Sequence, residues 1–384
     1  MSDLASPRLW LAPAASRVPI FSPSRRQVLR GLATAIVGLA AGVHPEPLVS
    51  LGPQQAVRGC NPILGVHTRL TDEVEEWKIK RTLEMVREMG AHWVVEYFPW
   101  AYVEPQPGRF SWAHADLTVK HAARQGLKLV ARLGYVPQWA RPTGSASSYL
   151  DPDHYDDFAR FCSRFAQRYR EEVAHVIVWN EPNLALEWGF RPPDPAGYAE
   201  LLHLCYGAIK AEAPETVVLG GALAPVPAPL DDPQAMDDLT FLERACAVGA
   251  CQSMDALAVH AYGWASPPED DPEPGRVNFR RAELLRAALG RLGYTGMPAY
   301  VTEAGWNDHP RWTRAVSPAL RLDYTVRAYE FARHRWSWCP MVATWAFRFP
   351  WLQHSYQDYF AFVTPGFQPR PVYDAVRLYA HQCR

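Results

Sequence analysis

The sequence predicts a single (β/α)8 barrel of the α/β class, and three observations support this prediction. From residue 62 onward, short apolar segments typical of strands alternate with longer amphipathic segments typical of helices. Eight such pairs follow one another, and strands that alternate with helices favour parallel β/α units, eight of which close a barrel. A segment of about 320 residues fits this fold with some long loops. An open doubly wound sheet is the alternative, but no glycine-rich phosphate turn follows the first strand segment.

The first four pairs are defined by apolar runs and by helix stop signals. Two helical segments, 73–90 and 114–126, end on a glycine, the residue that most often follows a helix. The expected strands of this half are 63–68, 92–98, 127–134 and 175–182, and the expected helices are 73–90, 114–126, 153–170 and 196–213. The fourth strand segment is unusual, because its apolar residues run into Asn180 and Glu181 and then stop at Pro182.

The last four pairs continue the alternation along the rest of the chain. Their expected strands are 216–221, 254–263, 298–306 and 340–349, and their expected helices are 238–247, 277–292, 318–334 and 371–381. We therefore expect residues 61–384 to form one catalytic barrel without an appended binding module.

The composition is that of a soluble globular protein with a large core. The 384 residues are 48% hydrophobic and carry a formal net charge of −1, so electrostatics gives no reason to expect nucleic acid or an acidic polymer as a partner. The chain contains 15 tryptophans. Core packing is the default explanation for them, but flat apolar rings also serve in sugar-binding clefts.

Seven cysteines are too few and too scattered for a disulfide scaffold, and their odd number leaves at least one unpaired. Cys246 and Cys251 could pair in an oxidising compartment, but we expect them to be buried as small apolar side chains. No histidine or cysteine cluster with metal-ligand spacing occurs, so neither a metal nor another cofactor is expected.

Residues 1–60 are expected to hold an export signal and a disordered linker. The basic stretch "SRRQVLR" at 24–30 precedes an apolar run at 31–43 that is too short to span a bilayer, which needs about 20 residues. This order suits a signal peptide, and the paired arginines resemble a twin-arginine signal, so export to the medium or the cell surface is expected. An uncleaved membrane tether stays an alternative, because no clear cleavage site follows, and so does a chance basic pair before a short helix.

Polar and aromatic side chains stand at the C-terminal ends of seven of the predicted strands. In a (β/α)8 barrel these ends converge on one mouth, where the active site lies. The residues are His67, Glu96, Arg132, Asn180, Glu181, His260, Tyr262, Glu303 and Trp345. Each has a structural alternative, since a lone glutamate can cap a helix or pair with an arginine, and a tryptophan can fill the barrel core. A set this polar from separate strands is less readily explained by structure alone.

Two of these residues indicate a chemistry. Glu181 and Glu303 end the fourth and seventh strands, on opposite sides of the mouth. Two carboxyl groups that face one cavity can cleave a glycosidic bond, one as general acid and base and the other as nucleophile. A separation of about 5–5.5 Å gives a retaining mechanism, and a wider gap gives inversion. Like charges this close should split their pKa values, so that one group stays protonated near neutral pH.

The sequence around both glutamates resembles the signatures of clan A retaining glycoside hydrolases, especially families 5 and 39. The stretches "WNEPN" at 179–183 and "VTEAGW" at 301–306 are similar to the paired motifs of that clan. The likeness extends through 97–140 to "VHAYG" and "ATWAF" in the sixth and eighth strands, and so covers residues 62–381. This resemblance, too, implies a (β/α)8 barrel.

The resemblance also implies roles for individual residues. Glu181 would be the acid/base and Glu303 the nucleophile. The remaining residues would contact the sugar or orient the nucleophile. They are Asn180 at the sugar 2-hydroxyl, Tyr262 beside the nucleophile, His260 in the same subsite and Trp345 as a platform under the sugar ring.

One departure from the clan concerns the cation beside the nucleophile. Many members carry an arginine at or near the end of the second strand, where this chain has Glu96. Arg132, at the end of the third strand, could supply the cation, and Glu96 could be its partner or accept a sugar hydroxyl. His67 is a further candidate for a sugar contact. Six loop tryptophans are also subsite candidates, although half of them are expected to be ordinary packing: Trp100, Trp139, Trp188, Trp264, Trp306 and Trp351.

Together these observations predict an exported, monomeric, retaining glycoside hydrolase that cleaves β-glycosidic bonds in oligo- or polysaccharides, with a carbohydrate as its partner and no nucleic acid. A transglycosylase using the same residues is one alternative. A non-catalytic carbohydrate-binding barrel is another, and the presence of both glutamates together with Asn180 and Tyr262 argues against it.

Overall fold

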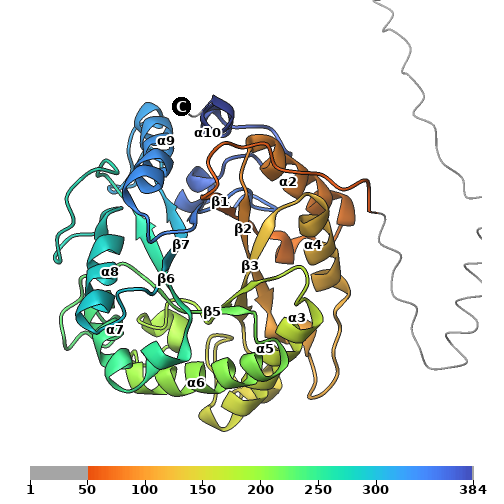
Figure 1. Cartoon of the computed structure of the whole chain (residues 1–384), viewed down its shortest axis with the longest axis vertical. Coiled ribbons are helices and arrows are strands. Elements are labelled where there is room, and N and C mark those ends of the chain that lie inside the picture. The colour runs from red at the N-terminus through yellow and green to blue at the C-terminus, as the bar shows by residue number, and fades with distance from the viewer. Residues whose placement is uncertain (1–50, 383–384) are drawn as a thin grey trace, which may run out of the picture. The chain divides into compact units, whose positions relative to one another are not determined.

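The chain folds into a closed barrel of eight parallel strands surrounded by helices (Figure 1). The computed structural model describes residues 51–382, and the predicted (β/α)8 barrel is confirmed. Each strand pairs with the next in chain order, and the last pairs with the first to close the ring. The strands are β1 (Leu64–His67), β2 (Trp93–Pro99), β3 (Lys128–Gly134), β4 (His175–Val178), β5 (Val217–Leu223), β6 (Ala256–Tyr262), β7 (Ala299–Gly305) and β8 (Val342–Thr344).

Helices follow every strand and cover the outside of the barrel (Figure 1). The α-helices are α2 (Glu76–Met89), α3 (Trp100–Val103), α4 (Ala113–Arg124), α5 (Tyr155–Arg168), α6 (Pro195–Glu212), α7 (Asp238–Ala247), α8 (Arg281–Arg291), α9 (Pro318–Arg335) and α10 (Pro371–Gln382). All eight predicted helices are present, with ends that differ by a few residues. The short α3 was not predicted, because a single turn leaves no periodic pattern in the sequence.

Two strands are shorter than predicted by four residues or more, β4 and β8, and both end just before residues of the candidate site. β4 ends at Val178 rather than at residue 182, because Trp179 and Glu181 have positive φ angles of 74° and 41°, which a strand does not allow. β8 spans only Val342–Thr344 of the predicted 340–349. In both places the chain leaves the sheet at the mouth of the barrel, so the residues that follow belong to the mouth and not to its wall.

Two apolar layers hold the barrel together. One lies between the strands and the surrounding helices, and the other fills the interior of the barrel. The inner layer includes Trp93, Val130, Ile177, Tyr300 and Met341, all buried. Because side chains fill the barrel, a ligand can approach the strand ends only at the mouth.

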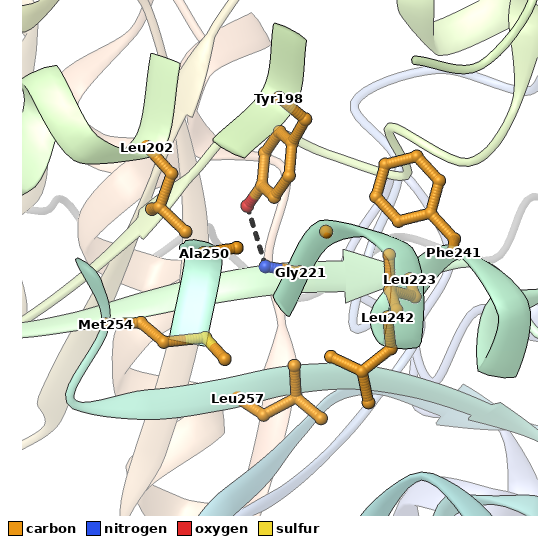
Figure 2. Close-up of a pocket in the computed structure, with 10 residues that line it drawn as sticks. Tyr198, Leu202, Gly221, Leu223, Phe241, Leu242, Ala250, Met254 and Leu257 are labelled. Atoms are coloured by element: carbon orange, nitrogen blue, oxygen red, sulfur yellow. Dashed lines mark hydrogen bonds between the residues drawn. The ribbon is translucent and has the colours of Figure 1, made fainter. Parts of the chain in front are cut away.

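Tyr198 of α6 joins the ends of β4 and β5 behind the mouth. Its hydroxyl donates to the carbonyl of Val178 (3.2 Å) and accepts from the amide of Gly221 (2.7 Å). Around it, side chains of α6, α7 and the adjacent strands enclose a small apolar cavity, which Figure 2 shows. Ligand sites combine apolar walls with convergent polar groups. This lining is almost wholly apolar, so we interpret the cavity as a feature of packing.

Residues 51–60 contain no helix or strand, but their backbone is hydrogen-bonded to the barrel at the end opposite the mouth. The amide of Gln55 donates to the carbonyl of Arg124, and the amide of Cys60 donates to that of Ala380, both at 2.8 Å. This part of the range that the sequence assigned to a linker is therefore packed. The twin-arginine motif and the apolar run lie outside the described residues. Within residues 51–382, no helix has the length and apolar character that a membrane crossing needs.

The expectation that Cys246 and Cys251 are merely buried was wrong, because the two form a disulfide. Cys246 lies in the last turn of α7, and Cys251 lies in the 3-10 helix η5 (Ala250–Ser253). The short connection between these helices brings the two Cα atoms to 4.8 Å, a separation that a disulfide spans. Three other cysteines, Cys162, Cys205 and Cys339, carry buried free thiols.

Candidate active site

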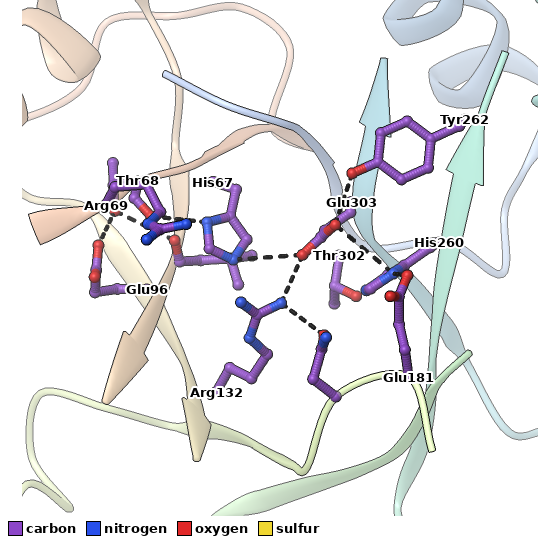
Figure 3. A network of polar contacts seen from close by, with 12 residues as sticks. His67, Thr68, Arg69, Glu96, Arg132, Glu181, His260, Tyr262, Thr302 and Glu303 are labelled. Atoms are coloured by element: carbon purple, nitrogen blue, oxygen red, sulfur yellow. Dashed lines mark hydrogen bonds and ion pairs between the residues drawn. The ribbon is translucent and has the colours of Figure 1, made fainter. Parts of the chain in front are cut away.

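Four side chains surround the carboxylate of Glu303, near the end of β7. Its Oε1 accepts a hydrogen bond from Nη1 of Arg132 (2.6 Å) and lies 3.8 Å from Nε2 of His67. Its Oε2 accepts from the hydroxyl of Tyr262 (2.7 Å) and lies 3.7 Å from Nδ1 of His260. Figure 3 shows these groups converging from β1, β3 and β6. Residues that the sequence placed at separate strand ends therefore meet at one carboxylate.

The surroundings of Glu303 keep its carboxyl group ionised. Burial by itself would raise the pKa of this carboxyl, since only 6% of the residue is exposed. The positive charges of His260 and Arg132 outweigh burial and, with the hydrogen bond from Tyr262, lower the pKa of Glu303 to about 2. Burial and the adjacent Glu303 raise the pKa of Tyr262 well above its usual value, so the phenol stays a donor. The predicted contact between Tyr262 and Glu303 is thus present.

Arg132 supplies the cation whose source the sequence left open. One nitrogen, Nη1, donates both to Glu303 and to Oδ1 of Asn180 (2.7 Å), and the guanidinium lies 5.0 Å from the centre of the Tyr97 ring. The side chain is 9% exposed, so little water screens its charge. Arg132 therefore links Glu303, the nucleophile candidate, to the side-chain amide of Asn180, the residue directly before Glu181.

Replacing Arg132 by glutamine should raise the pKa of Glu303 by about 1 to 3 pH units, because a nearby cation favours the ionised carboxyl by about that much. The wild-type starting value is about 2, so the variant should titrate inside the range that carbon NMR of a labelled glutamate side chain can follow. Arg314→Gln is a matched control, since Arg314 also lines the cleft but stacks on Trp264 at 3.7 Å. Unchanged titration of Glu303 in Arg132→Gln would contradict the assignment.

Glu181 is held in place by its backbone and by His260. Its φ of 41° lies in the left-handed region that residues other than glycine seldom adopt, and its amide donates to the carbonyl of Ala222 in β5 (3.0 Å). Its Oε1 lies 2.7 Å from Nδ1 of His260. Burial opposes the charged form of His260, but Glu303 and Glu181 raise its pKa above the usual value. The Glu181 side chain is 19% exposed, so it stays accessible from the cleft.

The two carboxylates face one space, as the sequence predicted. One oxygen of Glu181, one oxygen of Glu303 and a nitrogen of His260 all lie within 4.8 Å of one another. Three such donor atoms could hold a metal ion. However, Arg132 and Tyr262 already donate to Glu303, and the guanidinium would repel a cation. The arrangement therefore fits two carboxyl groups that are each hydrogen-bonded to neighbouring side chains better than a metal site.

Trp345, directly after β8, lines the cleft and meets the ring of His67 at a centroid distance of 4.5 Å. His67 is buried, and its Nδ1 donates to the carbonyl of Thr68 (2.7 Å), which leaves Nε2 as an acceptor. Burial and the charge of Arg132 lower the pKa of His67 well below its usual value, so the ring is neutral. His67 and His260 therefore lie behind the cleft surface, in contact with the carboxylates.

Glu96 does not have the role that the sequence suggested. It is fully buried, and its carboxylate accepts from the Thr68 hydroxyl (2.6 Å) and from the amides of Leu70 (2.9 Å) and Thr71 (3.0 Å). These bonds fix the start of the 3-10 helix η1 (Leu70–Asp72), so Glu96 neither pairs with Arg132 nor reaches the cleft. Glu96, in the middle of β2, therefore caps this short helix with its side chain.

The loop tryptophans divide between the cleft and packing. Trp264 lines the cleft, and Trp351 is 54% exposed outside it. Trp139 was predicted to bind sugar, but its indole donates to the carbonyl of Glu104 (3.0 Å) and it packs against other rings, so this prediction is corrected. The remaining three, Trp100, Trp188 and Trp306, are fully buried.

The site opens into a cleft of about 860 Å³ at the mouth of the barrel. Much of its lining is aromatic and was not predicted, namely Tyr97, Tyr135, Phe190, Trp312, Tyr356 and Phe360. Five of its residues have positive φ angles although none is glycine: Tyr135, Trp179, Glu181, Phe190 and Trp264. Strained backbone of this kind concentrates at functional sites, where the surrounding structure holds it.

Glu187 is a third carboxyl group in the cleft, and nothing in the sequence pointed to it. It lies in the 3-10 helix η4 (Ala185–Trp188), and its carbonyl accepts from the indole of Trp179 (2.8 Å). Burial and the nearby charge of Glu181 raise the pKa of Glu187 to about 7, against the lowering effects of Arg132 and of a hydrogen bond from Asn180. Only the fold of η4 brings this residue beside the pair.

The fold and the strand-end residues define a class of protein: a (β/α)8 barrel with two glutamates that face one cleft at its mouth. Comparison with solved structures agrees. A family 39 glycoside hydrolase from the gut symbiont Bacteroides cellulosilyticus WH2 is 20% identical with a TM-score of 0.66, over 83% of this chain and 63% of that one. A monomeric β-xylosidase from Caulobacter crescentus CB15 is 20% identical with a TM-score of 0.61, over 85% and 69%.

A third similar structure is the family 39 enzyme from Xanthomonas axonopodis pv. citri, which is 16% identical with a TM-score of 0.61, over 91% of this chain and 72% of that one. At these identities the likeness shows the fold, and the chain spans less than two thirds of the first of these proteins. A family model described as β-galactosidase of glycoside hydrolase family 42 matches residues 71–157. A search of curated protein sequences gave no significant match. The (β/α)8 fold that the resemblance implied is confirmed.

Proposed function

We propose that this protein is a retaining glycoside hydrolase that cleaves β-glycosidic bonds, with Glu181 as acid/base and Glu303 as nucleophile. One observation carries the proposal. Two carboxylates on opposite strands have oxygens within 4.8 Å of each other. So close an approach of two oxygens favours the retaining separation of about 5–5.5 Å between the carboxyl groups over the separation of about 6.5–9.5 Å that inverting enzymes need to admit a water molecule.

In the first step Glu303 attacks the anomeric carbon, while Glu181 donates its proton to the glycosidic oxygen. The bond between that carbon and oxygen breaks, the leaving group departs with the proton, and the sugar becomes an ester of Glu303. In the second step Glu181 takes a proton from water, whose oxygen displaces Glu303. Two inversions return the sugar with its original anomeric configuration.

The network around Glu303 supports its role as nucleophile. A nucleophile must be ionised before it attacks, and the charges of His260 and Arg132 lower the pKa of Glu303 to about 2 despite burial. The hydrogen bonds from Arg132 and Tyr262 fix both oxygens in place. Preorganised polar groups of this kind need no rearrangement during the reaction.

The neighbouring residues would bind the sugar. Asn180, oriented by Arg132, would contact the 2-hydroxyl, and Trp345 would lie under the ring. His67 would act mainly by holding Trp345, since it is buried beside that ring. These contacts would bind the glycon, the sugar that becomes attached to Glu303.

The proposal includes the location of the protein and its oligomeric state. We expect a secreted protein, since disulfides such as Cys246–Cys251 persist in oxidising compartments. We also expect a monomer. A transglycosylase would use the same residues and differ only in the acceptor. A non-catalytic sugar-binding barrel would have no use for a buried carboxylate held ionised beside a second one.

A panel of aryl β-glycosides, followed by proton NMR of the first sugar released, tests the proposal. We expect hydrolysis of at least one among xylosides, glucosides, galactosides, mannosides and arabinosides, with the β-anomer formed before mutarotation. The α-anomer as first product would exclude retention. Release of aryl alcohol without free sugar would indicate transfer to an acceptor, and sugar binding without turnover of any substrate would indicate a non-catalytic barrel.

A further inference from the structure

The cleft wall beside Glu181 is apolar, and we infer from it that the leaving group of the natural substrate is an apolar aglycone and not a second sugar. This inference rests on the proposed function, because it concerns the leaving-group side of the same site. It names a substrate class, a glycoside of an alkyl or aromatic alcohol.

The chemistry fixes where the leaving group lies. Glu303 attacks one face of the anomeric carbon, and the departing oxygen leaves from the opposite face beside Glu181, which must reach it with a proton. The groups suited to the glycon, Arg132 and Trp345, belong to β3 and to the segment after β8. The aglycone therefore extends from Glu181 over the segments that follow β4 and β5, which are tied together by two hydrogen bonds between Asn183 and Ala224.

Those two segments present an apolar surface to the cleft. Besides Trp179, Asn180, Glu181 and Glu187, six lining residues of these segments are apolar, namely Leu184, Leu186 and Phe190 after β4 and Ala224, Pro225 and Val226 after β5. None of the six has a side chain that can form a hydrogen bond. Leu186 is 56% exposed and Phe190 is 65% exposed, so their apolar surface is open to a ligand.

Two polar side chains near this wall, those of Glu187 and Ser148, are already engaged. Glu187, which lies between Leu186 and Trp188 in η4, interacts with Asn180 and Arg132 toward the base of the site. The hydroxyl of Ser148 donates to the carbonyl of Leu186 (2.7 Å). A subsite for a sugar would need donors and acceptors for several hydroxyl groups, because unpaired hydroxyls lose their bonds to water on binding. An alkyl or aryl group has no hydroxyl groups and needs no hydrogen-bond partners from the wall.

The backbone of Phe190 adds an independent observation. Its φ is 58°, in a region that bulky residues avoid, and its amide donates to the carbonyl of Ala185 (2.7 Å). This strained backbone holds an aromatic ring exposed to solvent at the cleft. Strain of this kind is typical of residues that clamp a ligand.

The alkyl glycosides in the test have leaving groups of similar acidity on one glycon, so that intrinsic reactivity is held constant within that series. Methyl, butyl and hexyl β-D-xylopyranosides and β-D-glucopyranosides are compared with xylobiose and cellobiose. Each buried methylene should raise kcat/KM about fourfold, so the hexyl glycoside should exceed the methyl glycoside at least tenfold and should also exceed the disaccharide. Equal rates across the alkyl series, or a faster disaccharide, would overturn the inference while leaving the proposed function intact.

Variants and a binding measurement separate the two proposals. The hexyl-to-methyl ratio should fall toward one in Leu186→Ser and in Phe190→Ser, and it should be kept in Leu230→Ser, an exposed leucine (73%) outside the cleft lining. Hydrolysis-resistant hexyl and methyl 1-thioglycosides, followed by tryptophan fluorescence of the wild-type protein, report the same preference without turnover. If no glycoside is hydrolysed, the proposed function fails, and equal binding of both thioglycosides then overturns this inference as well.

Discussion

Replacing Glu303 by alanine should lower kcat for aryl β-glycosides by roughly 10⁴-fold or more, because the step that forms the covalent intermediate loses its nucleophile. Sodium azide should restore part of the activity, since the shorter side chain leaves room for a small anion beside the anomeric carbon. The azide attacks the face that Glu303 used, and no second displacement follows. The product should therefore be the α-glycosyl azide, which NMR of the reaction mixture identifies.

Glu303→Gln is the matched control for folding. Alanine leaves the buried Arg132 without its carboxylate, which costs about 3–5 kcal/mol for a buried pair. Glutamine keeps an oxygen for Arg132 and a polar group for Tyr262, so it should lose the same activity with less effect on the thermal midpoint. If both variants keep wild-type turnover, Glu303 is not the nucleophile. A β-glycosyl azide from the alanine variant would show attack from the wrong face.

Much of the fold and the centre of the site could be predicted from the sequence, for a definite physical reason. Strand-end positions in a (β/α)8 barrel are forced to converge, so locating the ends of eight strands locates the mouth. Arg132, Tyr262 and Glu303 meet there although they are far apart in the chain. Their contacts follow from the closure of the barrel and need no knowledge of the loops.

The errors arose where a side chain had more than one partner within reach. The sequence placed Glu96 at a strand end, but it lies in the middle of β2, where its carboxylate accepts from the amides of Leu70 and Thr71 in the turn after β1. Trp139 was assigned to a subsite because it lies on a loop, and the direction of a loop side chain is not encoded in a periodic pattern. Glu187 reaches the site only because η4 folds back after Glu181, and no local sequence motif predicts that turn.

The pair Cys246 and Cys251 was missed for a related reason. Five residues of separation are compatible with two buried thiols or with a disulfide, and the choice depends on how the chain turns between α7 and η5. Turn geometry is the part of a fold that composition predicts least. In this protein the same kind of local turn, after β4, creates the cleft wall on which the leaving-group inference rests.

Replacing Glu181 by alanine should produce a loss that depends on the leaving group. Alkyl glycosides need a proton on the departing oxygen, so their kcat/KM should fall by about 10²–10⁴-fold. 2,4-Dinitrophenyl glycosides depart without a proton, so Glu303 should still be glycosylated at nearly the wild-type rate. Water then lacks its general base, the intermediate accumulates, and stopped-flow absorbance should show a burst. Azide should release the sugar from Glu303 as the β-glycosyl azide, the anomer opposite to the one expected from Glu303→Ala.

This prediction also decides which carboxyl group is the acid, because Glu187 is a physical competitor. Its pKa of about 7 would suit a proton donor, and it lies in the same cleft. Geometry favours Glu181, which is hydrogen-bonded to His260 and lies close to the nucleophile, whereas Glu187 interacts with Asn180 and Arg132. Glu187→Gln should therefore show neither the leaving-group dependence nor the azide rescue. If both effects appear in Glu187→Gln and are missing from Glu181→Ala, the proton comes from Glu187, and Glu181 serves to raise its pKa.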